Sequence, residues 1–524
     1  MSSTSQTGRA PRFPAASVLP GRAASFALLG IPAAVFVICR LSWIRTSTLE
    51  ADEAFTMRLV RHSWGELFRG AIQDRVHPPL FYILLKLWMA IGGENLTWLR
   101  LFPILTSLVW IVAMIGLAQE LGIGAAPAGL ALLFVALNGF LIRFSQELRM
   151  YSLLTALSLC SLWLFQRYLR SPRRWGSPLP ALIVINALMV YTHYFGWVVI
   201  LFEGGYLLWA DRSRIVPYGV GAAVVAVAFA PWALLVADGS VPIEKGMDEH
   251  LGWNTRPDWR DVASYFSQLH GPFRSGLDFS KSKVAVGFVL MAFPVAVAAV
   301  RALRAGMRRR GAAPDPDAAV VGWLIYFSLG PVLLLFVLSW VLPASVFGPR
   351  YMIYTAIPYL MLCAVSLWQL RPRSLRVAAV AASILWAAAG FAQEIRLGDY
   401  VDWRSLVDDM RRTEAADGRA PQSQEPLFVM GHVEPIRYAL ELEGETRYRA
   451  QSVGEIESLK GDRFWIAYQR SFWKRYPTQE MESVLAKRGY ALAKDYRSGL
   501  PEHAGHMSLY VRSGAAEPSA RDHP

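Results

Sequence analysis

The stretch FALLGIPAAVFVICRLSW, residues 26–43, is followed closely by LEADE, residues 49–53. The first stretch is long and apolar enough to form a helix across a bilayer, which takes about 20 residues. The second places three carboxylates just beyond that helix, where ionised side chains are costly and therefore often functional. Apolar segments of similar length recur as far as Gln393. The pattern predicts an α-helical, polytopic membrane protein.

Composition supports this class and excludes others. Of the 524 residues, 54% are hydrophobic and only 18% are charged, whereas soluble domains have about 25% charged residues. The net charge of +13 would suggest nucleic-acid binding in a soluble chain. Here the arginines lie between apolar segments, where they set orientation in the membrane. The three cysteines, Cys39, Cys160 and Cys363, lie within apolar runs without the spacing of a metal or redox site.

The apolar segments predict about eleven spans. They cover residues 26–44, 98–119, 125–143, 150–168, 179–194, 196–210, 216–237, 283–303, 318–342, 351–369 and 375–393. Arginines are concentrated in alternate connections: Arg167, Arg170, Arg173 and Arg174, then Arg212 and Arg214, then Arg301, Arg304, Arg308, Arg309 and Arg310, then Arg371, Arg373 and Arg376. Because basic residues favour the cytoplasmic side, we expect the N-terminal tail, residues 1–25, and these connections to be cytoplasmic.

One shorter apolar run, residues 78–92, is not counted as a span. It has about 15 residues, contains Lys86, and would reverse the alternation of the arginines if it crossed the membrane. We interpret it, with the amphipathic residues 54–71, as surface-lying helices of a long external loop, residues 45–97. A genuine twelfth span is the alternative.

The remaining regions divide into external segments. The bundle, residues 26–397, has a second external loop at residues 238–282. Residues 398–515 predict a small extracytoplasmic α/β domain, with strands at 427–430, 464–468 and 507–511 and helices at 434–442 and 478–488. Residues 516–524 have little apolar content and are expected to be disordered.

Several short polar motifs lie at the edges of apolar segments on the predicted external side. These are Asp52-Glu53, His77-Pro78-Pro79-Leu80, Glu147-Leu148-Arg149-Met150-Tyr151, Tyr191-Thr192-His193-Tyr194-Phe195 and Pro349-Arg350-Tyr351. The predicted topology therefore gathers acids, histidines and arginines at one membrane surface.

In these motifs, their order and their spacing, the chain resembles the lipid-linked-sugar glycosyltransferases of the GT-C fold. It is most similar to glycosyltransferase family 39, the protein mannosyltransferase and aminoarabinose transferase group, and to its bacterial lipopolysaccharide-type branch. The resemblance covers most of the membrane region. It implies a GT-C-like bundle in the bacterial inner membrane with its active site facing the periplasm.

The resemblance also implies a reaction. A sugar on a polyprenyl phosphate is transferred, with inversion, to an acceptor hydroxyl on a cell-envelope lipid, glycan or protein. A carboxylate accepts the hydroxyl proton, and cationic groups stabilise the departing lipid phosphate. By its match to the family's first acidic position, Asp52 is the expected base, with Glu53 as its competitor.

Other motif residues take roles by the same resemblance. His77, Arg149, Arg350 and Tyr351 are expected to bind the donor phosphate, and guanidinium groups suit its oxygens. Glu147, Tyr151, His193 and Tyr194 are expected to contact the acceptor or the sugar. A solvated loop for the acids, a turn for His77 and membrane anchors for the arginines are the structural alternatives. No cofactor and no essential metal are expected.

Three other functions remain open from the sequence, and one of them is a membrane scaffold whose external α/β domain binds glycan without chemistry. A transporter or flippase of a lipid-linked glycan would have charges near the bilayer centre and internal repeats, and the chain shows neither. An O-antigen-type ligase or polymerase would use a lipid diphosphate donor instead. The identity of the sugar and of the acceptor is not encoded in any motif.

Overall fold

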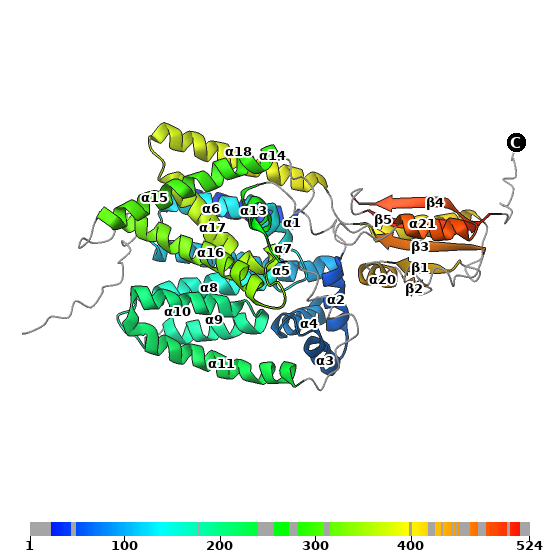
Figure 1. Cartoon of the computed structure of the whole chain (residues 1–524), viewed down its shortest axis with the longest axis horizontal. Coiled ribbons are helices and arrows are strands. Elements are labelled where there is room, and N and C mark those ends of the chain that lie inside the picture. Colours follow the sequence, from blue (N-terminus) through cyan, green and yellow to red (C-terminus); the bar gives the residue numbers. More distant parts are fainter. Residues whose placement is uncertain are drawn as a thin grey trace, which may run out of the picture. The chain divides into compact units, whose positions relative to one another are not determined.

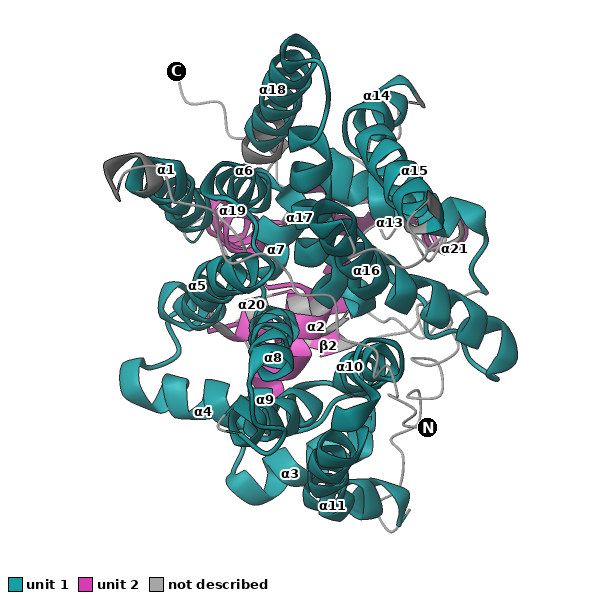
Figure 2. Ribbon diagram, turned by 90° about the vertical axis from the view of Figure 1, so that its left-hand side faces the viewer, with its two compact units in different colours: residues 1–44, 59–395 teal, residues 45–58, 396–524 magenta. Residues whose placement is uncertain are grey.

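The chain divides into two compact units, which Figures 1 and 2 show. Unit 1 contains residues 1–44 and 59–395, and unit 2 contains residues 45–58 and 396–524. The computed structural model describes residues 22–42, 44, 49–176, 178–238, 256–271, 281–308, 315–397, 401–417, 425–430, 433–442, 444–445, 448–450, 462–469, 478–499 and 504–513. The expected disordered tail, residues 516–524, and most of the expected cytoplasmic tail lie outside these residues.

Unit 1 is a bundle of helices. Its long members are α1 (Arg22–Leu41), α5 (Leu96–Glu120), α6 (Ala125–Leu137), α8 (Tyr151–Arg170), α9 (Pro178–Thr192), α10 (Gly196–Ala210), α11 (Ile215–Ala237), α15 (Phe293–Arg308), α16 (Pro316–Val341), α17 (Ala356–Trp368) and α18 (Arg373–Leu397). Each predicted apolar segment overlaps one of these helices. Six helical segments of the described chain are long and apolar enough to cross a membrane, and five further apolar helices are shorter.

Three of the predicted segments are not single regular α-helices. Asn138 separates α6 from α7 (Gly139–Phe144), because its side chain accepts a hydrogen bond from Leu141 N at 3.0 Å and so starts a new helix. Residues 283–303 combine α14 (Lys281–Gly287), a π-helical turn η2 (Phe288–Ala292) and α15. The segment 351–369 begins as the 3₁₀ helix η3 (Pro349–Thr355) before α17.

Close helix packing in unit 1 depends on a small residue. α1 lies against α6 at Gly129, where an added Cβ would come within 2.1 Å of the Leu28 carbonyl oxygen. Because that atom belongs to a helix backbone, it cannot move aside. The glycine therefore sets the distance between these two helices.

The first long connection contains short helices, α2 (Ala51–Arg61), α3 (Trp64–Asp74) and α4 (Leu80–Gly92). The stretch 54–71, predicted as one amphipathic element, is divided at Ser63, whose capping box with Glu66 starts α3. On α4, Lys86 Nζ donates to the carbonyls of Val60 at 2.8 Å and His62 at 2.5 Å. This lysine caps the end of α2 instead of facing solvent alone.

Unit 2 contains the small α/β domain. Its sheet has the order β2-β1-β3-β5-β4. The strands are β1 (Leu427–Met430), β2 (Tyr448–Ala450), β3 (Arg463–Gln469), β4 (Tyr490–Ser498) and β5 (Gly505–Arg512). Strands β2, β1 and β3 are parallel, and β5 and β4 continue the sheet antiparallel. Helices α19 (Trp403–Ala416) and α20 (Val433–Leu442) pack on one face, and α21 (Thr478–Lys487) packs on the other.

The predicted strands and helices of this domain match β1, β3, β5, α20 and α21. Three elements were not predicted. β2 is short, β4 has mostly exposed side chains without regular alternation, and α19 has polar composition apart from one buried stripe. None of them has the apolar run that identifies a buried element in a sequence.

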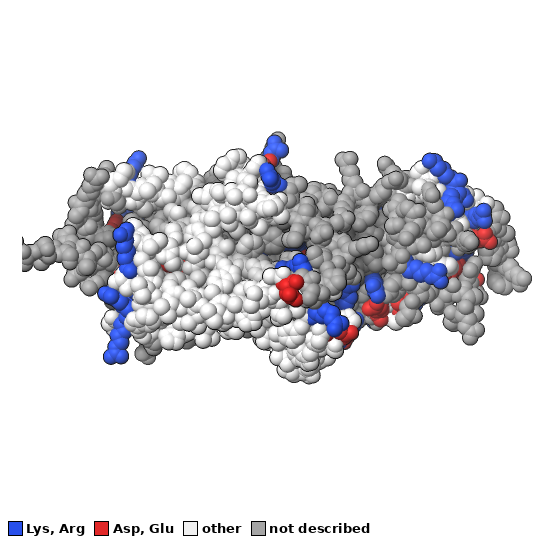
Figure 3. Space-filling model, turned by 60° about the horizontal axis from the view of Figure 1, so that its bottom comes forward, with Lys and Arg blue, Asp and Glu red and all other residues white. Residues whose placement is uncertain are grey.

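The arginine-bearing connections of unit 1 come together in pairs. Arg214 Nη1 and Nη2, after α10, donate to the carbonyls of Tyr168 at 2.8 Å and Ser171 at 2.5 Å, at the end of α8. Arg301 Nη1 on α15 donates to Gln369 O, after α17, at 3.0 Å. In Figure 3 the left-hand part of the surface is almost free of charged side chains, except for Lys and Arg along its left edge. An uncharged belt bounded by basic residues is typical of membrane proteins.

Candidate functional site

His77 lies in the short turn between α3 and α4. Arg75, with φ 54°, ends α3 in the left-handed conformation, and Pro79 is the N-cap of α4. The two prolines restrict the backbone between these helices. His77 is buried, and its Nδ1 lies 3.2 Å from Asp74 Oδ2 on α3. The carboxylate thus orients the imidazole.

Arg149 lies in the buried turn that joins α7 to α8. The turn is fixed from two sides, because Arg100 Nη1 donates to Gln146 O at 2.9 Å and the Gln146 side chain donates to the carbonyl of Arg40. Its backbone closes with a hydrogen bond from Arg149 N to Glu147 O at 2.7 Å. From this turn, Arg149 Nη2 reaches to 3.5 Å from His77 Nδ1.

His193 lies in the turn between α9 and α10. Its Nδ1 accepts a hydrogen bond from Phe195 N at 3.2 Å, so the proton of a neutral ring is on Nε2. That Nε2 is buried and has no hydrogen-bond partner among the described residues. The ring lies 5.3 Å from the His77 ring and 6.2 Å from the Tyr151 ring, measured between centroids.

Arg350 and Tyr351 lie in η3, and the Tyr351 ring lies near His193. The Tyr351 ring lies 6.4 Å from the His193 ring and 5.5 Å from the Phe195 ring. The guanidinium carbon of Arg350 lies 5.4 Å from the centre of the Tyr351 ring. Arg350 and Arg149 are both close enough to act electrostatically on His193.

Four segments far apart in the sequence therefore form one cluster. We refer to the set His77, Arg149, Tyr151, His193, Arg350 and Tyr351 as the histidine–arginine cluster. Its two guanidinium groups and two imidazoles lie in a largely buried environment, where charge interactions are stronger than in water. Guanidinium groups bind phosphate oxygens with two parallel hydrogen bonds. The cluster is thus chemically suited to an anion such as a phosphate.

Four predicted site residues are not part of the histidine–arginine cluster as defined above. The Tyr194 hydroxyl accepts a hydrogen bond from Trp232 Nε1 at 3.2 Å, and its ring lies edge-on to Phe229. Glu147 is buried in the same turn as Arg149. In unit 2, Glu53 is fully buried and its Oε2 accepts a hydrogen bond from Glu50 N at 2.8 Å, which caps α2. Asp52, the next residue back, is partly exposed.

Two contributing residues were not predicted from the sequence. Asp74 orients His77, and its position three residues before the histidine, at the end of an amphipathic helix, is a signal that could have identified it. Phe195 stacks on His193 with centroids 5.1 Å apart. In the sequence, a phenylalanine beside an apolar span carries no signal that separates it from the other residues of its motif.

Among the described residues, no group of three or more His, Cys, Asp or Glu side chains could hold a metal ion. The expectation that no metal is essential stays a prediction for the whole chain.

Comparisons with known proteins agree with the motifs. Residues 76–234 match the model of the family described as dolichyl-phosphate-mannose-protein mannosyltransferase. No curated protein sequence matches significantly. Among solved structures, the chain is similar to ArnT from Cupriavidus metallidurans in the apo state, with 16% identity, a TM-score of 0.52 and coverage of 93% of this chain and 98% of that one.

Two further structures share this likeness. ArnT from the same organism bound to undecaprenyl phosphate has 14% identity, a TM-score of 0.52 and coverage of 95% and 100%. The archaeal oligosaccharyltransferase AglB from Archaeoglobus fulgidus, in complex with an inhibitory peptide and a dolichol-phosphate, has 14% identity, a TM-score of 0.52 and coverage of 95% and 75%. The chain therefore has the GT-C fold of lipid-linked-sugar glycosyltransferases and resembles family 39 within it.

Proposed function

We propose that this protein is an inverting glycosyltransferase that uses a polyprenyl-phosphate sugar. It transfers the sugar to a hydroxyl group of a cell-envelope lipid, glycan or protein at the extracytoplasmic face of the bacterial inner membrane. The observation that carries the proposal is the histidine–arginine cluster, because it brings two guanidinium groups and the Nε2 of His193 together, and such groups bind phosphate oxygens. Solved structures of the same fold bind undecaprenyl phosphate or dolichol-phosphate, which supports a lipid phosphate as that anion.

In the proposed reaction, the acceptor oxygen attacks the anomeric carbon while the bond from that carbon to the phosphate oxygen breaks. The electron pair of the broken bond goes to the phosphate, whose negative charge rises. Arg149 and Arg350 stabilise this charge, and His193 donates its Nε2–H to a phosphate oxygen. The acceptor proton goes to a carboxylate acting as general base.

The local contacts of the two acids favour Asp52 as that base. Glu53 is fully buried and its Oε2 is already bound to the backbone N–H of Glu50. A carboxylate held in a helix cap stabilises the helix terminus. Asp52 is partly exposed on the same helix and is therefore the better candidate for contact with an acceptor.

The experiment uses purified protein in nanodiscs with a panel of polyprenyl-phosphate sugars and an envelope extract as acceptor. We expect release of free polyprenyl phosphate, and we expect Asp52→Asn to lower this release by at least about 100-fold, in the range of lost general-base catalysis. Glu94→Gln is the matched control, since Glu94 forms an exposed ion pair with Arg61 at 2.5 Å. Full turnover in Asp52→Asn would transfer the base assignment to another group.

The same assay separates the alternative functions. A flippase moves the lipid-linked sugar without breaking the bond between sugar and phosphate, so no free polyprenyl phosphate is produced. An O-antigen-type ligase requires a sugar on a polyprenyl diphosphate, so it too releases no polyprenyl phosphate from these donors. No release from any donor in the panel, with an intact fold, would exclude the proposed reaction for those sugars.

A further inference from the structure

A buried carboxyl group lies in the middle of four helices of unit 1. Glu203 on α10 is fully buried. Its Oε1 lies 2.7 Å from Ser161 Oγ on α8. Its Oε2 lies 2.8 Å from the Tyr218 hydroxyl on α11 and 3.3 Å from Asn186 Nδ2 on α9. One side chain thus joins all four helices.

In the part of the chain that the structure describes, no cation is among the hydrogen-bond partners of this carboxyl group. Its three partners are a hydroxyl, a phenol and an amide, all of them neutral. An ionised carboxylate buried without a cation costs many kcal/mol, and such a group takes up a proton instead. The absence of a cation among the partners of Glu203 therefore favours the neutral acid.

The hydrogen positions lead to the same conclusion. Ser161 Oγ lies 2.5 Å from Asn186 Oδ1 and 2.7 Å from Glu203 Oε1, yet a hydroxyl has only one proton to donate. If the Asn186 amide is turned over, its oxygen faces Glu203 Oε2 instead. In either orientation, one close pair of oxygens lacks a proton unless Glu203 carries it.

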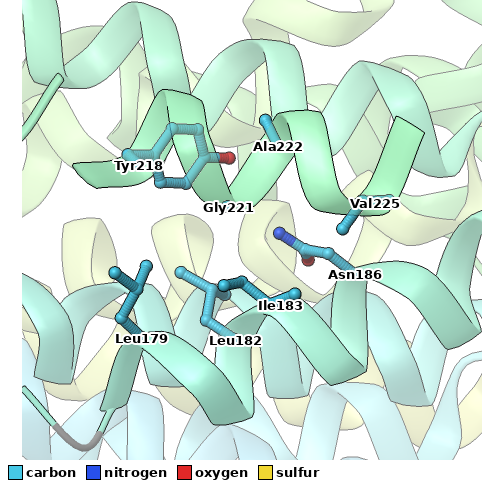
Figure 4. A pocket seen from close by; sticks show the side chains of 8 residues that line it. All are labelled: Leu179, Leu182, Ile183, Asn186, Tyr218, Gly221, Ala222 and Val225. Carbon is cyan, nitrogen blue, oxygen red and sulfur yellow. The ribbon is translucent and has the colours of Figure 1, made fainter. Parts of the chain in front are cut away.

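The crevice beside two partners of the carboxyl group is mostly apolar. Figure 4 shows the small crevice between α9 and α11 where Asn186 and Tyr218 lie. The rest of its lining is Leu, Ile, Val, Ala and Gly. Apolar walls of this kind offer no counter-charge to an ionised acid.

We propose that Glu203 is a neutral carboxylic acid that positions the histidine–arginine cluster by locking α8, α9 and α10 together. The role as a positioning residue rests on the proposed function. Tyr151 begins α8, ten residues before Ser161, and His193 follows the end of α9, seven residues after Asn186. At 1.5 Å per residue, the clamp lies about 10–15 Å along the helices from the cluster.

The protonation state is tested by infrared spectroscopy of the full-length protein. We expect a carbonyl band of a protonated carboxyl group at neutral pH that is missing in Glu203→Gln. The matched control is Glu120→Gln, because Glu120 lies 3.6 Å from Arg167 and 3.4 Å from Arg170 and so has the positively charged partners that Glu203 lacks. An unchanged band in Glu203→Gln, or a lost carboxylate band in its place, would overturn the neutral acid. This measurement does not depend on turnover.

The positioning role is tested by sugar transfer in three variants. Glu203→Gln offers an amide N–H to Ser161 and an amide oxygen to Tyr218, so we expect transfer within about threefold of the wild type. Glu203→Leu removes the clamp, and we expect about tenfold or greater loss, as for a broken buried network.

A double variant separates positioning from general destabilisation. If Glu203 acts through His193, Glu203→Leu should add little loss when His193→Asn is already present, because coupled positions are not additive. Fully additive losses, or equal loss in Glu203→Gln and Glu203→Leu, would contradict the positioning role while leaving the infrared result standing.

Discussion

Replacing His193 with asparagine isolates one proton donor of the site. In the structure, Nδ1 accepts from Phe195 N at 3.2 Å, and Nε2 is buried without a hydrogen-bond partner among the described residues. An asparagine Oδ1 can take the place of Nδ1 in the turn, because both accept from the backbone. His193→Asn therefore keeps the turn and removes the Nε2–H.

The size of the effect follows from these contacts. A hydrogen bond to a charged phosphate oxygen is worth about 1.5–3 kcal/mol, which corresponds to about 10- to 150-fold in kcat/KM at about 1.4 kcal/mol per tenfold. Stability should change little, because the smaller side chain leaves a cavity but also removes an unsatisfied buried polar atom. His193→Asn is thus expected to lower activity while leaving the stability of the fold nearly unchanged.

The assay compares the release of polyprenyl phosphate with the thermal unfolding of the same preparations. His193→Phe is the companion variant. It keeps an aromatic ring beside Phe195 but leaves the Phe195 N–H without its acceptor. We therefore expect it to lose both activity and stability. Wild-type turnover in a stably folded His193→Asn would refute the reasoning, because the Nε2–H would then make no contact with the donor.

Two further predictions concern the stability of the α/β domain in unit 2 and the absence of a metal requirement. Although burial raises the pKa of Asp495 on β4, hydrogen bonds from His506, Ser508 and Arg497 lower it more, to about 2. Because the folded pKa lies below the usual value of 3.8, the ionised Asp495 stabilises the fold above that pH, and this stabilisation is lost as the pH falls toward 2. We expect Asp495→Asn to lack about 1–2 kcal/mol of this pH-dependent stability. The measurement is amide exchange in β4 and β5, corrected for its intrinsic pH dependence. Treatment with a metal chelator is expected to leave sugar release unchanged, measured against a sample with added magnesium; a loss restored by magnesium would show an essential metal.

The membrane helices were predictable because apolar length is a strong signal. Predicted segments such as 196–210 and 216–237 match α10 and α11 within a residue. The departures occur where a polar side chain competes with the helix, as at Asn138, or where Pro349 starts a 3₁₀ turn. Such interruptions are decided by a single side-chain contact, and the average hydropathy of a segment does not detect them.

The residues of the site were predictable only as separate motifs. The order of His77, Arg149, His193 and Arg350 could be noted in the sequence, but their contacts depend on how four helix ends meet. The expectation that no ionisable residue lies near the middle of a span was wrong at Glu203, which lies midway along the predicted span 196–210. One acid inside an apolar segment looks like any polar interruption. Its role becomes visible only when Ser161 and Asn186 come within hydrogen-bond distance.

The most direct test of the central claim is the identity of the phosphorus-containing product. A defined polyprenyl-phosphate sugar is incubated with the full-length protein and an envelope acceptor, and phosphorus NMR follows the lipid. The account predicts that the phosphodiester signal is replaced by that of a phosphate monoester, at a rate that falls in Asp52→Asn and in His193→Asn. A phosphodiester signal that persists when folded protein and acceptor are both present would contradict it.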